Sequence, residues 1–118
     1  LYEKRISPTW KYEQRNYWRK GGNSPMAVGG RMATVGNWEE ATKNWNQVIA
    51  TSTKRKTLGR ACYNLALAAE VNGDLLSAKD WISKSYGQYN NKKAQYYQNI
   101  INRRYNEMIK LEEQSIQK

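Results

Sequence analysis

The stretches Gly36-Asn37-Trp38-Glu39-Glu40-Ala41 and Gly73-Asp74-Leu75-Leu76-Ser77-Ala78 follow one pattern, 37 residues apart in a chain of 118. Each begins with a glycine and a residue that can cap a helix, and apolar runs with helical spacing lie before and after it. A glycine followed by a cap residue is typical of the turn between two helices. Because the pattern occurs twice, the sequence predicts stacked helical hairpins.

Apolar residues recur at intervals of three and four along most of the chain, and no useful length alternates with period two. We therefore predict an all-α protein of about five to six antiparallel helices, folded as one domain over 1–118. Its expected parts are a lead-in helix over 8–20, a first repeat over 24–52, a second repeat over 57–88 and a long closing helix over 91–114 that caps the stack. Since the chain begins Leu1-Tyr2-Glu3, we expect it to be a fragment of a longer protein.

The composition is basic and rich in polar aromatic residues. Lys and Arg number 20 against 10 Asp and Glu, which gives a formal charge of +10, and there are five Trp and nine Tyr but no Phe. Such a charge suits nucleic acid, an anionic membrane surface or an acidic partner, although a solvated basic face is the simpler explanation. The single cysteine, Cys62, lies among small apolar residues, so we expect it to pack in the core.

The sequence offers little for catalysis or for binding a metal or cofactor. Histidine is absent, and we find no phosphate-binding glycine motif and no metal-ligand spacing. The carboxylate pairs Glu39/Glu40 and Glu112/Glu113 are adjacent in sequence and therefore point to different sides of a helix. We predict that the protein is not an enzyme and takes no cofactor.

The segment Ala61-Cys62-Tyr63-Asn64-Leu65-Ala66, with Gly73-Asp74, Ala78 and Trp81 after it, resembles a tetratricopeptide repeat. A more divergent copy precedes it, so that the resemblance covers about residues 24 to 88. It implies a short right-handed superhelix of hairpins. The spacing of 37 departs from the family's period of about 34, and Trp45 and Trp81 are out of register by one position. The residues expected to define the repeats are Gly29, Gly36, Trp38, Ala41, Trp45, Leu65, Ala66, Gly73, Ala78 and Trp81.

Proteins with such repeats bind partners on the concave surface that their first helices form. The resemblance therefore implies a candidate binding surface of exposed side chains from the second repeat and the closing helix, namely Arg60, Tyr63, Leu67, Glu70, Tyr97, Arg104 and Tyr105. Met26 and Ala33 are the corresponding candidates in the first repeat. The alternative is that Tyr63 and Tyr97 simply pack between helices.

Three hypotheses for function follow. The first is a non-catalytic scaffold that binds a protein or peptide, or docks onto another domain of its own chain. The second is a nucleic-acid-binding module, since Tyr residues lie beside several basic clusters. The third is a structural spacer in a larger envelope protein. The basic clusters are Arg15, Arg19 and Lys20, then Lys54, Arg55, Lys56 and Arg60, then Lys92, Lys93, Arg103 and Arg104.

The string from Trp10 through Tyr17-Trp18-Arg19-Lys20-Gly21 to Asn37-Trp38-Glu39-Glu40-Ala41 and Tyr63-Asn64-Leu65-Ala66 also resembles the C-terminal part of uncharacterised cell-envelope proteins of Bacteroidota, a group that includes predicted lipoproteins. The resemblance implies an upstream domain and a periplasmic or outer-membrane-associated location. Without that resemblance, the expected location is the cytoplasm.

Overall fold

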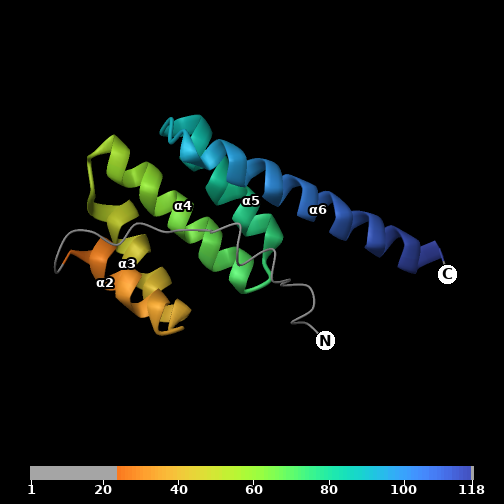
Figure 1. Ribbon diagram of the computed structural model, residues 1–118, viewed down its shortest axis with the longest axis horizontal. Coiled ribbons are helices and arrows are strands. Elements are labelled where there is room, and N and C mark those ends of the chain that lie inside the picture. The colour runs from red at the N-terminus through yellow and green to blue at the C-terminus, as the bar shows by residue number, and fades with distance from the viewer. Residues whose placement is uncertain (1–23, 118) are drawn as a thin grey trace.

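The computed structural model describes residues 24–117 of the chain (Figure 1). The predicted lead-in helix over 8–20 lies outside these residues. The described part is all helical, and each α-helix packs against the next along the chain, which confirms the predicted fold class. Its elements are α2 (Pro25–Thr34), α3 (Trp38–Thr51), α4 (Arg55–Val71), α5 (Leu75–Ser83), a π-helical segment η2 (Lys84–Gln88) and α6 (Lys93–Gln117).

The turns after α2 and α4 have the same geometry. Gly36 and Gly73 adopt φ of +82° and +84°, a left-handed conformation that glycine adopts without a steric penalty. The amide of each glycine donates to the carbonyl three residues before it, and the amide of the next residue donates to the carbonyl five residues before it. This is the Schellman motif, in which the turn satisfies carbonyls left over at the end of a helix.

The residue after each glycine caps the following helix. The Asn37 side chain accepts a hydrogen bond from the Glu40 amide at 3.2 Å, and the Asp74 carboxylate accepts one from the Ser77 amide at 3.1 Å. These bonds satisfy amide groups that a helix start leaves without an intrahelical partner. The two predicted turn motifs therefore form as the sequence pattern indicates.

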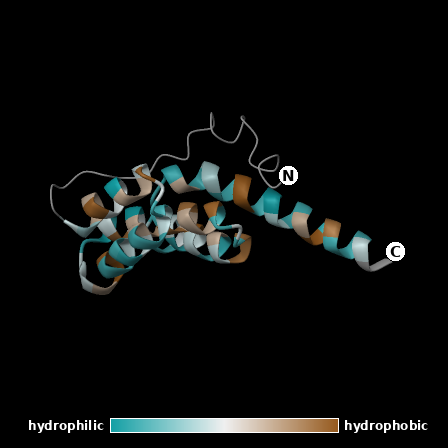
Figure 2. Cartoon of the chain, turned by 90° about the horizontal axis from the view of Figure 1, so that it is seen from below, coloured by the Kyte–Doolittle hydropathy of each residue, from teal (hydrophilic) through white to brown (hydrophobic). Residues whose placement is uncertain are grey.

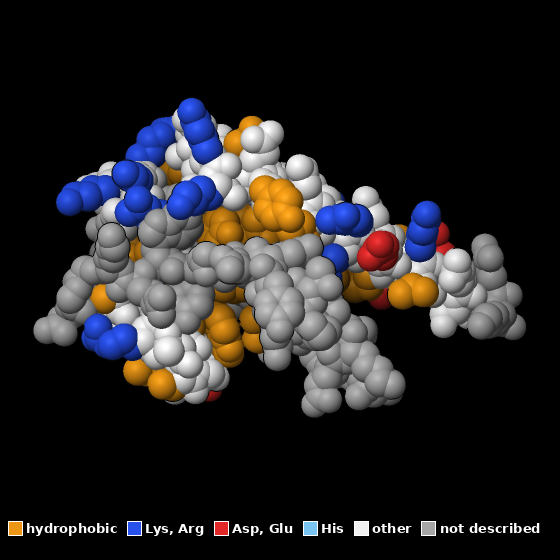
Figure 3. Space-filling view, viewed as in Figure 1, with side chains coloured by type: hydrophobic (Ala, Val, Ile, Leu, Met, Phe, Trp, Pro, Cys, Tyr) orange, Lys and Arg blue, Asp and Glu red, His pale blue; other side chains and the backbone are white. Residues whose placement is uncertain are grey.

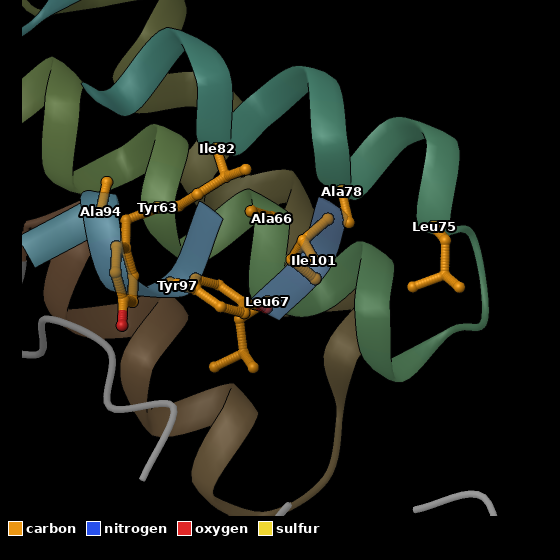
Figure 4. Packing of buried hydrophobic residues seen from close by; sticks show 9 residues of the cluster. All are labelled: Tyr63, Ala66, Leu67, Leu75, Ala78, Ile82, Ala94, Tyr97 and Ile101. Carbon is orange, nitrogen blue, oxygen red and sulfur yellow. The ribbon is translucent and has the colours of Figure 1, made fainter. Parts of the chain in front are cut away.

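Two hydrophobic clusters hold the helices together. The first joins α2, α3 and α4 around Trp45, which is fully buried. The second joins α4, α5 and α6, and Figure 4 shows the α5 side chains Leu75, Ala78 and Ile82 directed toward residues of the other two helices. Trp38 and Trp81 pack against both clusters while remaining partly exposed. The core is therefore continuous from α2 to α6.

The closing helix is the longest element. It runs from Lys93 to Gln117, against the expected 91–114, and its C-terminal part extends past the other helices (Figure 1). Figure 2 shows hydrophobic positions recurring between hydrophilic ones along that extension. They continue the three-and-four spacing seen in the sequence.

The second repeat differs from expectation at its start and within its second helix, while its end at Gln88 agrees with the prediction. Helix α4 begins at Arg55, two residues before the expected start, and the helix after Gly73 changes at Lys84 into the π-helical segment η2. No pattern in the sequence predicted that change. The segment brings the chain to Tyr89, Asn90 and Asn91, and Asn90 adopts a φ of 56°, which asparagine tolerates better than most residues.

Candidate functional site

The candidate surface predicted from the repeats lies where α4 meets α6. The Tyr97 hydroxyl donates a hydrogen bond of 2.6 Å to Oε1 of Glu70. Nη1 of Arg104 donates to the other carboxylate oxygen, Oε2, and forms an ion pair with it. The rings of Tyr63 and Tyr97 lie 5.1 Å apart between centroids. The structure therefore brings together residues that are distant in sequence and were predicted to share one surface.

Most of that predicted surface is buried. The exposed fractions of Tyr63, Leu67, Glu70 and Tyr97 are 8%, 2%, 2% and 1%. The expectation that these four side chains are exposed for binding is therefore wrong, because three of them belong to the hydrophobic cluster that α4, α5 and α6 share. The alternative that Tyr63 and Tyr97 pack between helices is confirmed.

The remaining candidates include both buried and partly exposed side chains. Met26 and Ala33 are buried in the cluster around Trp45. Arg60, Arg104 and Tyr105 are partly exposed.

A carboxylate taken out of water needs hydrogen bonds to offset its lost hydration, and Glu70 receives one on each oxygen. The Glu70 network thus has a structural role, which is to fix α6 against α4.

A second site lies at the opposite end of α4. A cavity of about 570 Å³ opens there between the start of α4 and the start of α6. Two basic clusters that are separate in sequence meet around it, and Figure 3 shows Lys and Arg side chains gathered over this end of the molecule. We call this cavity the basic pocket. Its basic and aromatic lining residues are Arg55, Lys56, Arg60, Tyr89, Lys92 and Lys93.

The basic pocket contains only part of the predicted basic clusters. Arg103 and Arg104 lie farther along α6 and do not line it, and Lys54 lines a neighbouring cavity. Arg15, Arg19 and Lys20 lie outside the described residues. Sequence patterns gave the clusters but could not show which of them meet, because that depends on the packing of α4 against η2 and the segment after it.

A third site is a groove of about 630 Å³ between α3 and α5. Trp38 and Trp81, both half-buried, line it together with Leu65 and Ala68 of α4. The ammonium group of Lys84 lies 5.1 Å from the centroid of the Trp81 ring. We call this groove the tryptophan groove. From the sequence these tryptophans were expected only to help define the repeats, and the groove that they leave open was missed.

The cysteine is placed as expected. Cys62 is buried in α4, and this burial raises the pKa of its thiol to about 11, partly opposed by the nearby Lys84 charge. The thiolate is the reactive form of cysteine. At neutral pH the side chain is therefore a protonated core residue and a poor nucleophile.

Residues 24–117 contain neither a metal-ligand cluster nor a helix that could span a membrane. In that range no three His, Cys, Asp or Glu side chains come together in a way that could hold a metal ion. None of the described helices combines the length and the apolar character that crossing a membrane requires.

Comparison with known proteins gives a family without an assigned activity. The chain has no significant match among curated proteins or among solved structures. A family model described as "Domain of unknown function (DUF6340)" matches residues 27–110. The match runs from the first turn of α2 well into α6 and so includes the basic pocket and the tryptophan groove. Because it covers most of the chain, the protein belongs to the DUF6340 family.

Proposed function

We propose that the chain is a non-catalytic interaction module built on hairpins like those of tetratricopeptide repeats, and that it binds a protein or peptide segment. The repeated turns at Gly36 and Gly73 support the likeness to such repeats. The observation that carries the proposal is the tryptophan groove, in which two half-buried indole rings flank an apolar floor. Tryptophan is enriched at the centres of protein interfaces, where burial of its large ring contributes much of the binding energy.

The charges around the groove define the kind of segment that fits. Glu39 and Asp74 line the groove together with one cation, Lys43, whose ammonium group forms an ion pair of 3.2 Å with Glu40. Hydrogen bonds from the Ser77 amide and hydroxyl hold the pKa of Asp74 below its ordinary value of 3.8. The Asp74 carboxylate is therefore charged at neutral pH. The matching segment carries a large apolar side chain for the floor and a Lys or Arg beside it for the carboxylates that line the groove.

The test uses fluorescein-labelled peptides with a central Leu or Trp, flanked either by Lys and Arg or by Glu and Asp. Binding is followed by fluorescence anisotropy with the wild-type chain and two variants. Asn46 lines the groove, whereas the neighbouring Gln47 is exposed and does not. N46R and Q47R therefore add the same charge to the same helix, but only N46R obstructs the groove.

We expect the basic peptides to bind more tightly than the acidic ones, and N46R to weaken that binding about tenfold, or ~1.4 kcal/mol. Q47R should behave like wild type. Equal binding by N46R and Q47R, or preference for the acidic peptides, would refute the groove as the binding surface.

Nucleic-acid binding is a second candidate, favoured by the convergence of two basic clusters at the basic pocket. Phosphate contacts release counterions, so such binding falls steeply as salt rises. A salt titration of binding to a single-stranded oligonucleotide separates the two candidates. A flat dependence, or no binding at low salt, would exclude this second function.

A further inference from the structure

The charges of the described chain are separated along α4. Residues 41–69 and 81–106 contain no Asp or Glu. These ranges supply the basic pocket, whose five cationic residues belong to the first turns of α4 and to the start of α6. The acidic residue Glu70 lies at the other end of α4, and Asp74 caps the helix that follows, α5. The basic pocket is therefore a region of concentrated positive charge with no carboxylate in its lining.

The backbone adds to that charge, because both α4 and α6 begin at the pocket. The N-terminus of a helix carries a partial positive charge of about half an elementary unit. Lys54, the N-cap residue of α4, makes no side-chain capping hydrogen bond. Arg55, Lys56 and Lys93, which line the pocket, thus lie in the first turns of these two helices.

Hydrogen bonds hold the pocket wall in place. The buried Ser85 hydroxyl donates to the Gly59 carbonyl at 2.6 Å, and the Asn91 side-chain amide donates to Oγ of Ser85 at 3.0 Å. Nη2 of Arg55 donates to the Gln88 carbonyl at 2.8 Å, which ties the start of α4 to the end of η2. Short π-helical segments often occur at functional sites, and this one delivers Tyr89 to the pocket.

Close backbone packing supports the same wall. A Cβ atom added at Gly59 would lie 3.0 Å from Cβ of Tyr89 and 3.4 Å from Cβ of Asn91. The glycine therefore lets the segment after η2 approach α4, which brings Lys92 and Lys93 toward the basic residues of α4. The backbone packing of this segment against α4 therefore holds the positive charges of the pocket close together.

We infer that the basic pocket binds a compact cluster of two or more phosphate groups. Several cations around one cavity match the charge of clustered phosphates, and Arg can bind phosphate oxygens in pairs. The volume lies within the range of about 300–1,000 Å³ typical of small-ligand sites. A compact ligand fits better than a long strand, because the cations converge on one cavity. This inference stands independently of the tryptophan groove.

The phosphates could belong to a soluble molecule or to lipid headgroups at a membrane surface. Sodium tripolyphosphate serves as the soluble probe, measured by isothermal titration calorimetry and thermal melting in phosphate-free buffer. Co-sedimentation uses phosphatidylcholine vesicles with and without phosphatidic acid. Binding to tripolyphosphate alone identifies a soluble source. Binding to the phosphatidic acid vesicles that tripolyphosphate displaces identifies a headgroup, and either result supports the site.

Matched variants separate a site from general charge attraction. K56Q/K92Q removes two exposed cations of the pocket, and R103Q/K110Q removes two exposed cations of α6 that do not line it. We expect one-to-one binding that raises the melting temperature. The pocket variant should bind on the order of tenfold more weakly, and the control variant within about twofold of wild type.

Three outcomes would overturn the inference. The first is no binding of either probe, with circular dichroism showing the chain folded. The second is an equal loss of affinity in both double variants, which indicates a diffuse charge effect. The third is binding of a single-stranded oligonucleotide that tripolyphosphate neither competes with nor reproduces, which would favour an extended strand along α6.

Discussion

The hairpin of α2 and α3 and the hairpin of α4 and α5 close through the same turn but fill their interiors with different side chains. Gly36 and Gly73 have nearly equal φ angles, and both turns make equivalent hydrogen bonds. Where the first hairpin has Gly29 and Trp45, the second has Ala66 and Ile82, each 37 residues later.

The packing of Trp45 against Gly29 explains why the two hairpins differ at these positions. We call the two residues at these positions the packing pair of each hairpin. In the first hairpin a Cβ atom added at Gly29 would lie 2.7 Å from Cδ1 of Trp45, so glycine leaves the space that the indole ring occupies. In the second hairpin the corresponding residues, Ala66 and Ile82, are both fully buried in one hydrophobic cluster, and the Ile82 side chain is smaller than an indole ring. Cores tolerate changes that conserve total volume. The two hairpins thus share one turn geometry but differ in their packing pair. The first combines glycine with a large indole ring, and the second combines alanine with a smaller isoleucine.

A second difference concerns what each hairpin contacts next. Ala33 in the first hairpin corresponds to Glu70 in the second, and Glu70 binds Tyr97 and Arg104 of α6. The second hairpin therefore carries a polar anchor for the closing helix at a position where the first hairpin is apolar. Identical turns can accordingly serve different neighbours in the stack.

The largest effect is expected from removing the ring that fills the first hairpin. Trp45→Ala should lower the free energy of unfolding by about 3 to 5 kcal/mol, because a fully buried indole leaves a cavity. Trp81 lies one position before the counterpart of Trp45 and is half-buried, so Trp81→Ala should cost less than about 2 kcal/mol. Urea denaturation measures both. Equal losses would mean that Trp81 is packed as tightly as Trp45.

The next effect comes from adding a single methyl group. Gly29→Ala should destabilise the fold by up to about 3 kcal/mol, because the overpacked methyl meets the buried indole ring. The reverse change at the counterpart, Ala66→Gly, should cost about 1 kcal/mol through helix propensity. If Gly29→Ala stabilises the chain, as helix propensity alone would predict, then the proposed packing pair is wrong.

The anchor to α6 should contribute less. Tyr97→Phe removes the hydroxyl that donates to the buried Glu70 carboxylate, and should cost about 1 to 2 kcal/mol. The adjacent Tyr96 is 63% exposed and provides a matched control, since Tyr96→Phe should leave the midpoint of urea unfolding unchanged. Similar midpoints for both variants would show that the hydrogen bond to Glu70 adds no stability.

The smallest loss of stability is expected from removing either helix cap, and the two losses should depend on pH differently. Asp74→Ala and Asn37→Ala should each cost about 1 kcal/mol at pH 7. Because the pKa of folded Asp74 is lowered, its contribution is present above the ordinary aspartate pKa and is lost as pH falls through the lowered value. The cost of Asp74→Ala should therefore shrink in acid while that of Asn37→Ala stays constant. Parallel pH profiles from urea melts would contradict this assignment.

Local features of the fold could be predicted from sequence because short segments determine them. A left-handed glycine followed by Asn37 or Asp74 specifies a turn and a cap without help from distant residues. The packing register was harder to predict. Aligning Trp45 with Trp81 left a mismatch of one position, because the true counterpart of Trp45 is Ile82, a residue of different shape and similar role.

The candidate sites depended on distant contacts. Repeat position alone could not show that Glu70 is buried, because its burial comes with the packing of α6 beside α4. The basic pocket likewise requires α4 to meet the segment after η2, and no local pattern at Lys84 signalled a π-helical segment. Sequence could therefore identify the charged residues but not their arrangement around a cavity.

The central claim, that the two hairpins are one unit with an exchanged packing pair, is tested most directly by a double-mutant cycle. Gly29→Ala/Trp45→Ile gives the first hairpin the pair found in the second, and urea denaturation gives the free energy of unfolding for all four chains. We predict that the double variant is more stable than the sum of the single losses allows, by at least about 1 kcal/mol. Additive losses would contradict the claim.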